Sequence, residues 1–207
     1  MTRRVLLGLV ACVAAACRAD DRQPSASAAA LATATARAAP AVPDSQYAIA
    51  VQLHRFQDSV GGQLATLAGG AVSRDALVRG FVRAVEASDT AALARMQLTA
   101  REFASLYYPD NKMSRPPYEL EPQLMWLQIE AQGDRGRARL LHQYGGKPLG
   151  FRSLECAAPE RQGESLLHEC RVRHATIPAG RRVVERLFGT ILETHGRFKF
   201  VSYSNPL

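Results

Sequence analysis

The sequence predicts an α+β fold, with helices in the first part of the folded region and an antiparallel sheet in the last part. Between positions 49 and 144, apolar residues recur at spacings of three and four, which place them on one face of a helix. From Lys147 onward, the spacing changes to the period of two that is typical of strands. Helices followed by an antiparallel sheet define the α+β class. The composition, 47% hydrophobic and 22% charged, fits a globular core rather than a disordered chain.

The N-terminus has the layout of a bacterial export signal. Arginines at positions 3 and 4 precede an apolar run over residues 5–16, and small residues at 14–16 precede Cys17. The apolar run is shorter than the ~20 residues that a bilayer span needs. Small residues before a cysteine resemble the lipobox of bacterial lipoproteins, in which the cysteine is acylated. This resemblance implies a signal peptide over residues 1–17 and a membrane lipid anchor on Cys17.

Other processing sites remain open. The segment Leu9-Val10-Ala11-Cys12 matches a lipobox better letter for letter, although the apolar stretch before it is short. Ordinary cleavage after Ala16 or Ala19 would instead give a secreted soluble protein. Arg18 follows the lipobox cysteine, where well-studied Gram-negative bacteria use an aspartate to retain lipoproteins at the inner membrane. By that analogy, the anchor favours the outer membrane and a periplasm-facing domain.

Residues 18–44 are expected to form a disordered linker. They are mainly Ala, Ser, Thr and Pro, with almost no large apolar side chains, although the alanines also permit a transient helix. Such a segment cannot bury enough surface to offset the entropy of ordering. We interpret it as a flexible tether between the membrane and a single α+β domain over residues 45–207.

Capping residues mark the starts of the predicted helices. The predicted caps are Ser45, Ser73, Asp89 and Thr99, the last in a capping box with Glu102. The first helix is expected to end near Val60, before two glycines. Further on, Pro122 is expected to start a helix, and Asp134 to cap another that ends before Gly145.

Four strand-like runs follow. They cover approximately 149–156, 166–173, 183–193 and 197–203. The last two are expected to pair as a hairpin across His195-Gly196. That register places Phe198 and Phe200 on an almost wholly apolar face toward the core, and Lys199 on the opposite face. Replacement of Lys199 by alanine is therefore expected to change stability little, unless Lys199 lines a cleft.

Cys156 and Cys170 are expected to form a disulfide. An exported protein with two cysteines outside its signal segment usually pairs them. Both lie in strand-like sequence, which suits a bridge between neighbouring strands. In the chain-entropy model, a loop of this size contributes ~3 kcal/mol to stability.

Three segments carry a family resemblance. They are Phe81–Leu93 (FVRAVEASDTAAL), Glu102–Asp110 (ending in LYYPD) and Gly196–Ser204 (GRFKFVSYS). They resemble two successive helical segments and the last strand of the nuclear transport factor-like superfamily, which includes polyketide-cyclase-like and ketosteroid-isomerase-like proteins. The resemblance implies a curved antiparallel sheet around helices, a cone-like roll, often with a pocket in the concave face. No catalytic residue of that superfamily matches this chain by motif.

Charge and motifs give little evidence of catalysis. The net charge of +7 comes almost entirely from arginine and leaves attraction to an anionic surface open. The export signal, and the lack of aromatic residues among the arginines, argue against nucleic acid. His168 and His174 share a strand face with Cys170, but at ~3.3 Å per residue the histidines lie ~20 Å apart, too far for one metal ion. No phosphate loop, dinucleotide fingerprint or nucleophile elbow occurs, so no cofactor, metal or catalytic residue is predicted.

A ligand cleft remains the only site hypothesis. Aromatic residues cluster around a proline-bearing loop over residues 110–118. The expected cleft contains Tyr107, Tyr108 and Trp126, with Arg186, Lys199 and Tyr203 as polar members of a concave sheet face. The alternative is that the aromatic residues close the end of a core and the polar residues point to solvent.

Three functions remain open at this point. The first is a membrane-tethered, non-enzymatic module that binds a small ligand or an envelope protein. The second is a small-molecule enzyme of the isomerase or cyclase type, which needs a buried carboxylate or histidine with a shifted pKa in a deep pocket. The third is a purely structural envelope lipoprotein.

Overall fold

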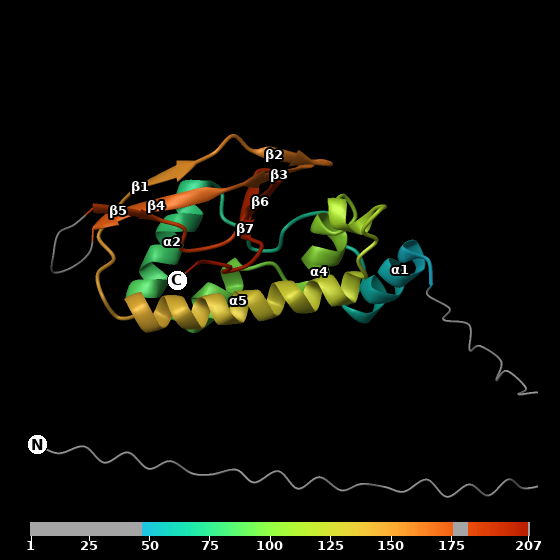
Figure 1. The fold of residues 1–207 in the computed structure, drawn as a ribbon, viewed down its shortest axis with the longest axis horizontal. Helices are drawn as coiled ribbons and strands as arrows, with labels where there is room; N and C mark the ends of the chain where they lie inside the picture. Colours follow the sequence, from blue (N-terminus) through green and yellow to red (C-terminus); the bar gives the residue numbers. More distant parts are fainter. Residues whose placement is uncertain (1–46, 176–181, 207) are drawn as a thin grey trace, which may run out of the picture. The chain divides into compact units, whose positions relative to one another are not determined.

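Figure 1 shows the computed structural model, which describes residues 47–175 and 182–206. The described residues belong to one compact unit. The predicted signal peptide, the anchor at Cys17, the linker over residues 18–44 and the predicted cap Ser45 lie outside the described residues.

Helices precede strands along the chain, which confirms the predicted α+β class. The helices and helical turns are α1 (Ile49–Ser59), α2 (Arg74–Glu86), α3 (Thr90–Met96), α4 (Ala100–Glu102), the π-helical turn η1 (Phe103–Tyr107), the 3-10 turn η2 (Lys112–Ser114) and α5 (Pro122–Tyr144). The strands are β1 (Phe151–Cys156), β2 (Glu160–Gln162), β3 (Ser165–His168), β4 (Cys170–Ala175), β5 (Arg182–Glu185), β6 (Ile191–Thr194) and β7 (Arg197–Phe200).

Three predicted caps have the expected geometry. The side chains of Ser73 and Asp89 each accept a hydrogen bond from the backbone N–H three residues on, at 3.1 and 2.8 Å. Thr99 and Glu102 form the capping box, because each side chain accepts from the backbone N–H of the other residue. These bonds satisfy N–H groups that the first turn of a helix leaves without an intrahelical partner. The helix starts are therefore encoded locally.

The long helix α5 differs from the prediction. Asp134 does not cap a new helix, because α5 continues through it without a break. A Cβ atom on Gly136 would lie 1.7 Å from the carbonyl oxygen of Tyr203, and one on Gly133 would lie 2.7 Å from the amide nitrogen of Gln97. These glycines allow close packing against the rest of the domain instead of ending the helix. Tertiary contacts thus override a weak local preference.

The strands form two antiparallel sheets rather than one. The first has the order β1-β4-β5 and the second has the order β2-β3-β6-β7. Two of the predicted strands are each divided between the sheets. The run 166–173 breaks at Glu169 into β3 and β4, and the run 183–193 breaks after Glu185 into β5 and β6. An alternating pattern predicts extended chain, but it does not show where that chain leaves one sheet for another.

The C-terminal hairpin has the predicted register. Thr194 pairs with Arg197, so the turn is His195-Gly196. Both turn residues have positive φ, 49° and 68°. Positive φ at both positions is the requirement of a type I′ turn, whose twist matches that of the flanking strands. The register gives β6 and β7 one continuous ladder.

Aromatic side chains fill the centre of the domain. Figure 1 shows α2 between the sheet of β1, β4 and β5 and the long helix α5. The Phe81 ring on α2 lies 5.2 Å from Phe188 and 5.6 Å from Phe200, measured between ring centroids. Phe200 is fully buried and Phe198 is 8% exposed. Both are core residues, as predicted.

The predicted disulfide between Cys156 and Cys170 is present. The two residues face each other at the ends of the paired strands β1 and β4, with Cα atoms 4.0 Å apart. The bridge joins neighbouring strands of the first sheet.

Candidate functional site

The structure does not bring the six residues of the expected cleft together. Tyr108, Lys199 and Tyr203 are buried in the packed interior. Trp126 packs against Phe103, with ring centroids 5.4 Å apart. Arg186 lines a shallow hollow beside the disulfide. Tyr107, Tyr108 and Trp126 do pack together around Phe103, where they close one part of the core rather than line a cleft with Arg186, Lys199 and Tyr203.

The two buried tyrosines have structural partners. The Tyr108 hydroxyl donates to the carbonyl oxygen of Leu120, and the Tyr203 hydroxyl donates to that of Leu93, each at 2.6 Å. Burial is the main cause that raises the pKa of Tyr108 to about 12, and it also raises the pKa of Tyr203 above its ordinary value. Both hydroxyls therefore stay protonated and are already engaged as donors.

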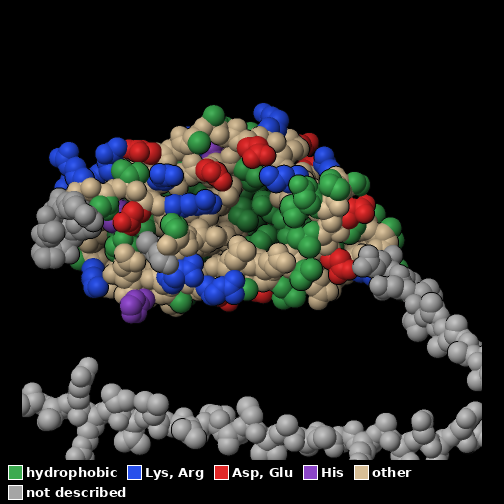
Figure 2. Space-filling view, viewed as in Figure 1, with side chains coloured by type: hydrophobic (Ala, Val, Ile, Leu, Met, Phe, Trp, Pro, Cys, Tyr) green, Lys and Arg blue, Asp and Glu red, His purple; other side chains and the backbone are tan. Residues whose placement is uncertain are grey.

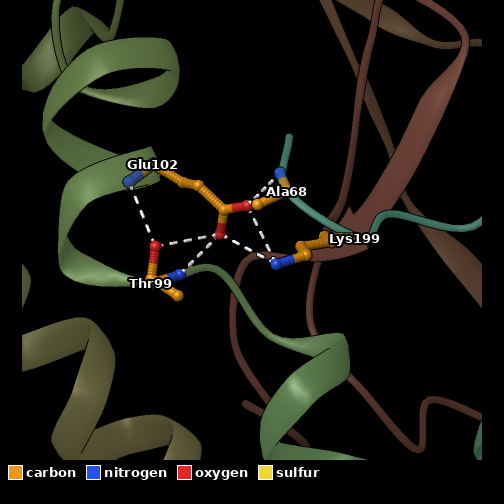
Figure 3. A network of polar contacts seen from close by, with 4 residues as sticks. All are labelled: Ala68, Thr99, Glu102 and Lys199. Carbon is orange, nitrogen blue, oxygen red and sulfur yellow. Dashed lines mark hydrogen bonds and ion pairs between the residues drawn. The ribbon is translucent and has the colours of Figure 1, made fainter. Parts of the chain in front are cut away.

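Lys199 forms a buried ion pair with Glu102 (Figure 3). Its Nζ atom lies 2.9 Å from both carboxylate oxygens. The backbone N–H of Ala68 donates to Oε1 at 2.7 Å. The backbone N–H and the hydroxyl of Thr99 donate to Oε2 at 2.8 and 3.1 Å. The network joins β7, the start of α4 and the segment before α2.

Lys199 therefore does not point to solvent, and the reason for expecting a small stability effect on its replacement does not hold. Alternation correctly placed Lys199 opposite Phe198 and Phe200, but that face also lies in the interior, beside Leu192 and Val201. A buried cation needs a partner charge. Glu102 supplies that charge while it also closes the capping box, a second role that the local sequence does not reveal.

His168 and His174 lie on different strands and do not form a metal site. The Arg74 guanidinium lies 3.3 Å from Nδ1 of His168, and the Glu193 carboxylate lies 2.6 Å from Nε2. Because a guanidinium only donates and a carboxylate only accepts, both ring nitrogens of His168 are occupied. Across the described ranges, no group of three His, Cys, Asp or Glu side chains has a metal-binding arrangement.

His174 has one ring nitrogen in a polar contact. Its Nε2 lies 3.3 Å from the carboxylate of Glu185, which also accepts a 2.5 Å hydrogen bond from the Tyr144 hydroxyl. Within the described residues, Nδ1 of His174 has no hydrogen-bond partner. Burial and the Glu185 carboxylate raise the pKa of Tyr144, so this hydroxyl stays a donor.

One member of the expected cleft, Tyr107, lines a polar hollow of about 480 Å³. We call it the proline-loop hollow, because it lies between the loop over residues 110–118 and the β2–β3 hairpin. The charged side chains around it are Asp110, Lys112, Arg115, Glu160 and Arg161. Two segments that are about 50 positions apart in the sequence therefore form one site.

Hydrogen bonds hold the two sides of the hollow together. The side-chain amide of Gln162 donates to the carbonyl oxygen of Tyr107 at 2.7 Å, and that of Asn111 donates to Gln162 at 3.2 Å. Gly163, at the turn of the hairpin, has a φ of +58°. A Cβ atom there would lie 1.8 Å from the carboxylate of Asp110. A glycine is required for this close contact.

Two of the cations at the hollow lack an ion-pair partner in the part of the chain that the structure describes. Arg115 pairs with Asp110 at 3.0 Å. Lys112 and Arg161 form no ion pair with any other described residue. Burial, and to a smaller extent the charge of Glu160, raise the pKa of Tyr107, while a hydrogen bond from Asn111 lowers it. The hollow thus combines a neutral phenol with two charged donors that have no carboxylate partner within residues 47–175 and 182–206.

The proline-bearing loop was predicted from the sequence, but the opposite side of the hollow, the β2–β3 hairpin, was not. The β2–β3 hairpin reverses at Gly163-Glu164, where Gln162 pairs with Ser165. A two-residue turn that contains glycine is a recognised hairpin signal, so this element could have been found. Its docking onto the proline-bearing loop depends on long-range contacts.

No family model, no curated protein and no solved structure matches this chain. None of the helices in the described part of the chain combines the length and the apolar character needed to cross a bilayer.

Proposed function

We propose that the protein is an exported lipoprotein, anchored at Cys17, whose domain is a non-enzymatic binding module facing the periplasm from the outer membrane. The export-type N-terminus and the lipobox-like residues before Cys17 support the anchor. The nuclear transport factor-like resemblance stays a prediction.

The proline-loop hollow is the observation that carries the binding role. Two of its cations, Lys112 and Arg161, favour a small molecule with a carboxylate or phosphate group. Tyr107 and Tyr118 add aromatic surface on the same wall, which suits a ligand with an apolar part. The bound ligand would therefore be small, anionic and partly apolar.

The observations favour binding over catalysis. Glu102 is fully buried, as a general base in a deep pocket would be. However, it already accepts hydrogen bonds from Ala68, Thr99 and Lys199. These donors belong to the domain itself, so both carboxylate oxygens are already engaged in holding the fold together.

Thermal unfolding of the full chain with added anions tests the proposal. Citrate, benzoate and inorganic phosphate serve as probes, because a ligand that binds only the folded state raises the melting temperature. We expect citrate or benzoate at millimolar concentration to stabilise the protein, and Lys112→Ala/Arg161→Ala to abolish the shift. Arg171→Ala, at an exposed arginine of β4, is the matched control and should keep the shift. Equal responses in all three proteins would refute a ligand site in the hollow. If none of the three anions raises the melting temperature of the unmodified protein, the proposed binding role is refuted in favour of a purely structural envelope lipoprotein.

A further inference from the structure

Exposed apolar side chains concentrate at one end of the domain. The described residues contain seven large hydrophobic side chains that are exposed. Five of them belong to the start of α1 or to the loop and first turns of α5: Tyr47, Val51, Tyr118, Leu124 and Leu127. Figure 2 shows hydrophobic side chains gathered around α1 and the neighbouring loop, whereas many of the Lys and Arg side chains lie at the opposite end. Exposed apolar side chains that gather in one region are candidates for an interaction surface.

Three of these five side chains line a groove of about 490 Å³. Tyr47, Tyr118, Leu120 and Leu124 line the groove itself. Leu127 lies one helical turn beyond Leu124 on the same face of α5, so the apolar surface continues along that helix. We call these residues, with Val51, the α1–α5 groove. Tyr118 lines both this groove and the proline-loop hollow, and all the other lining residues of the two differ.

The rim of the groove is acidic. Glu119 and Glu121 are both exposed and line the groove, and neither forms an ion pair with another described residue. The backbone N–H of Leu120, between them, donates to the carbonyl oxygen of Met113 at 2.8 Å and holds the loop in place. The guanidinium of Arg55, on α1, stacks 3.7 Å from the centroid of the Tyr47 ring, and Arg115 pairs with Asp110. On a chain with a net charge of +7, this is a local region of opposite sign.

We propose that the α1–α5 groove binds an amphipathic segment of a partner protein, with apolar side chains in the groove and lysine or arginine beside Glu119 and Glu121. An apolar groove that accepts the apolar face of a helix is a common mode of peptide recognition. The charges of Glu119 and Glu121 favour a basic protein segment over an anionic bilayer as the molecule bound in the groove. An anionic bilayer would be repelled by both carboxylates, whereas a basic segment would be attracted.

A labelled peptide tests this proposal on the full chain. The probe is a short amphipathic helical peptide of leucine and lysine, followed by fluorescence anisotropy. A peptide in which glutamate replaces lysine is the charge control. We expect the lysine peptide to bind and Leu124→Ser/Leu127→Ser to weaken it roughly tenfold or more, since two apolar side chains are lost. Glu119→Gln/Glu121→Gln should weaken it roughly threefold to tenfold and reduce its salt dependence.

Two control variants, together with vesicle binding and sedimentation analysis, separate peptide binding in the groove from the alternatives. Val72→Ser removes an exposed apolar side chain elsewhere and should leave peptide binding unchanged. Lys112→Ala/Arg161→Ala should also leave it unchanged, so failure of the hollow and failure of the groove are distinguishable. Equal binding of the two peptides, or no effect of the leucine variants, would overturn the proposal. So would binding to phosphatidylglycerol vesicles that Leu124→Ser/Leu127→Ser abolishes, or a dimer in sedimentation analysis that the same variant dissociates.

Discussion

Replacement of Lys199 by methionine should strongly destabilise the domain. Methionine keeps most of the apolar stem of Lys199 but removes the ammonium group that contacts both oxygens of Glu102. Glu102 would then remain fully buried, with a charge that no cation balances. Loss of one partner from a buried ion pair costs about 3–5 kcal/mol. Because donors from Ala68 and Thr99 remain, we expect the lower end of that range, about 3 kcal/mol.

Urea unfolding of the full chain measures this change, with the midpoint and slope fitted separately. Arg197→Ala is the matched control, because Arg197 is an exposed cation on the same strand. It should change the free energy of unfolding by less than about 1 kcal/mol.

A double variant separates the charge effect from lost packing. Glu102→Gln removes the negative charge and keeps an acceptor oxygen for the capping bonds. If the uncompensated charge is the cause, Glu102→Gln/Lys199→Met should be more stable than Lys199→Met alone. A loss at Lys199→Met no larger than that at Arg197→Ala would refute the buried pair. A double variant less stable than Lys199→Met would refute the uncompensated charge as the cause.

Three further changes test the core, the α5 packing and the disulfide. Phe200→Ala should lower the free energy of unfolding by about 3–5 kcal/mol in urea melts, because it empties a fully buried site; a loss below about 1 kcal/mol would contradict the packing. Gly136→Ala should destabilise by at least about 1–3 kcal/mol despite the higher helix propensity of alanine, since its Cβ would overlap the carbonyl oxygen of Tyr203; a gain in melting temperature would contradict the close contact. Reduction of the Cys156–Cys170 bridge should lower stability by about 3 kcal/mol, and thiol counting on unfolded, unreduced protein should find no free thiol at these positions.

Local signals in the sequence predicted much of the fold. The caps at Ser73, Asp89 and Thr99 each depend on side chains within three residues, and all three formed as expected. The hairpin across His195-Gly196 likewise follows from strand alternation and a two-residue turn that ends in glycine. Features whose cause lies within a few residues can be read from one sequence.

Features that depend on long-range packing could not be predicted in the same way. Asp134 looks like the cap of a new helix until Gly136, two residues on, is placed against the backbone of Tyr203 within the continuous helix α5. Lys199 looks exposed until Glu102, 97 positions away, is placed beside it. The proline-loop hollow needs the β2–β3 hairpin as its second side. In each case, the deciding partner lies far along the chain.

Native mass spectrometry of the protein extracted from its own membrane tests both the lipid anchor and the ligand site. We expect a chain that begins at Cys17 with a diacylglycerol modification and carries a non-covalent small anionic ligand. That ligand should be lost in Lys112→Ala/Arg161→Ala and kept in Arg171→Ala. A mature chain without lipid would contradict the anchor. A ligand retained equally by both variants, or no bound ligand in the native protein, would contradict the proline-loop hollow as its site.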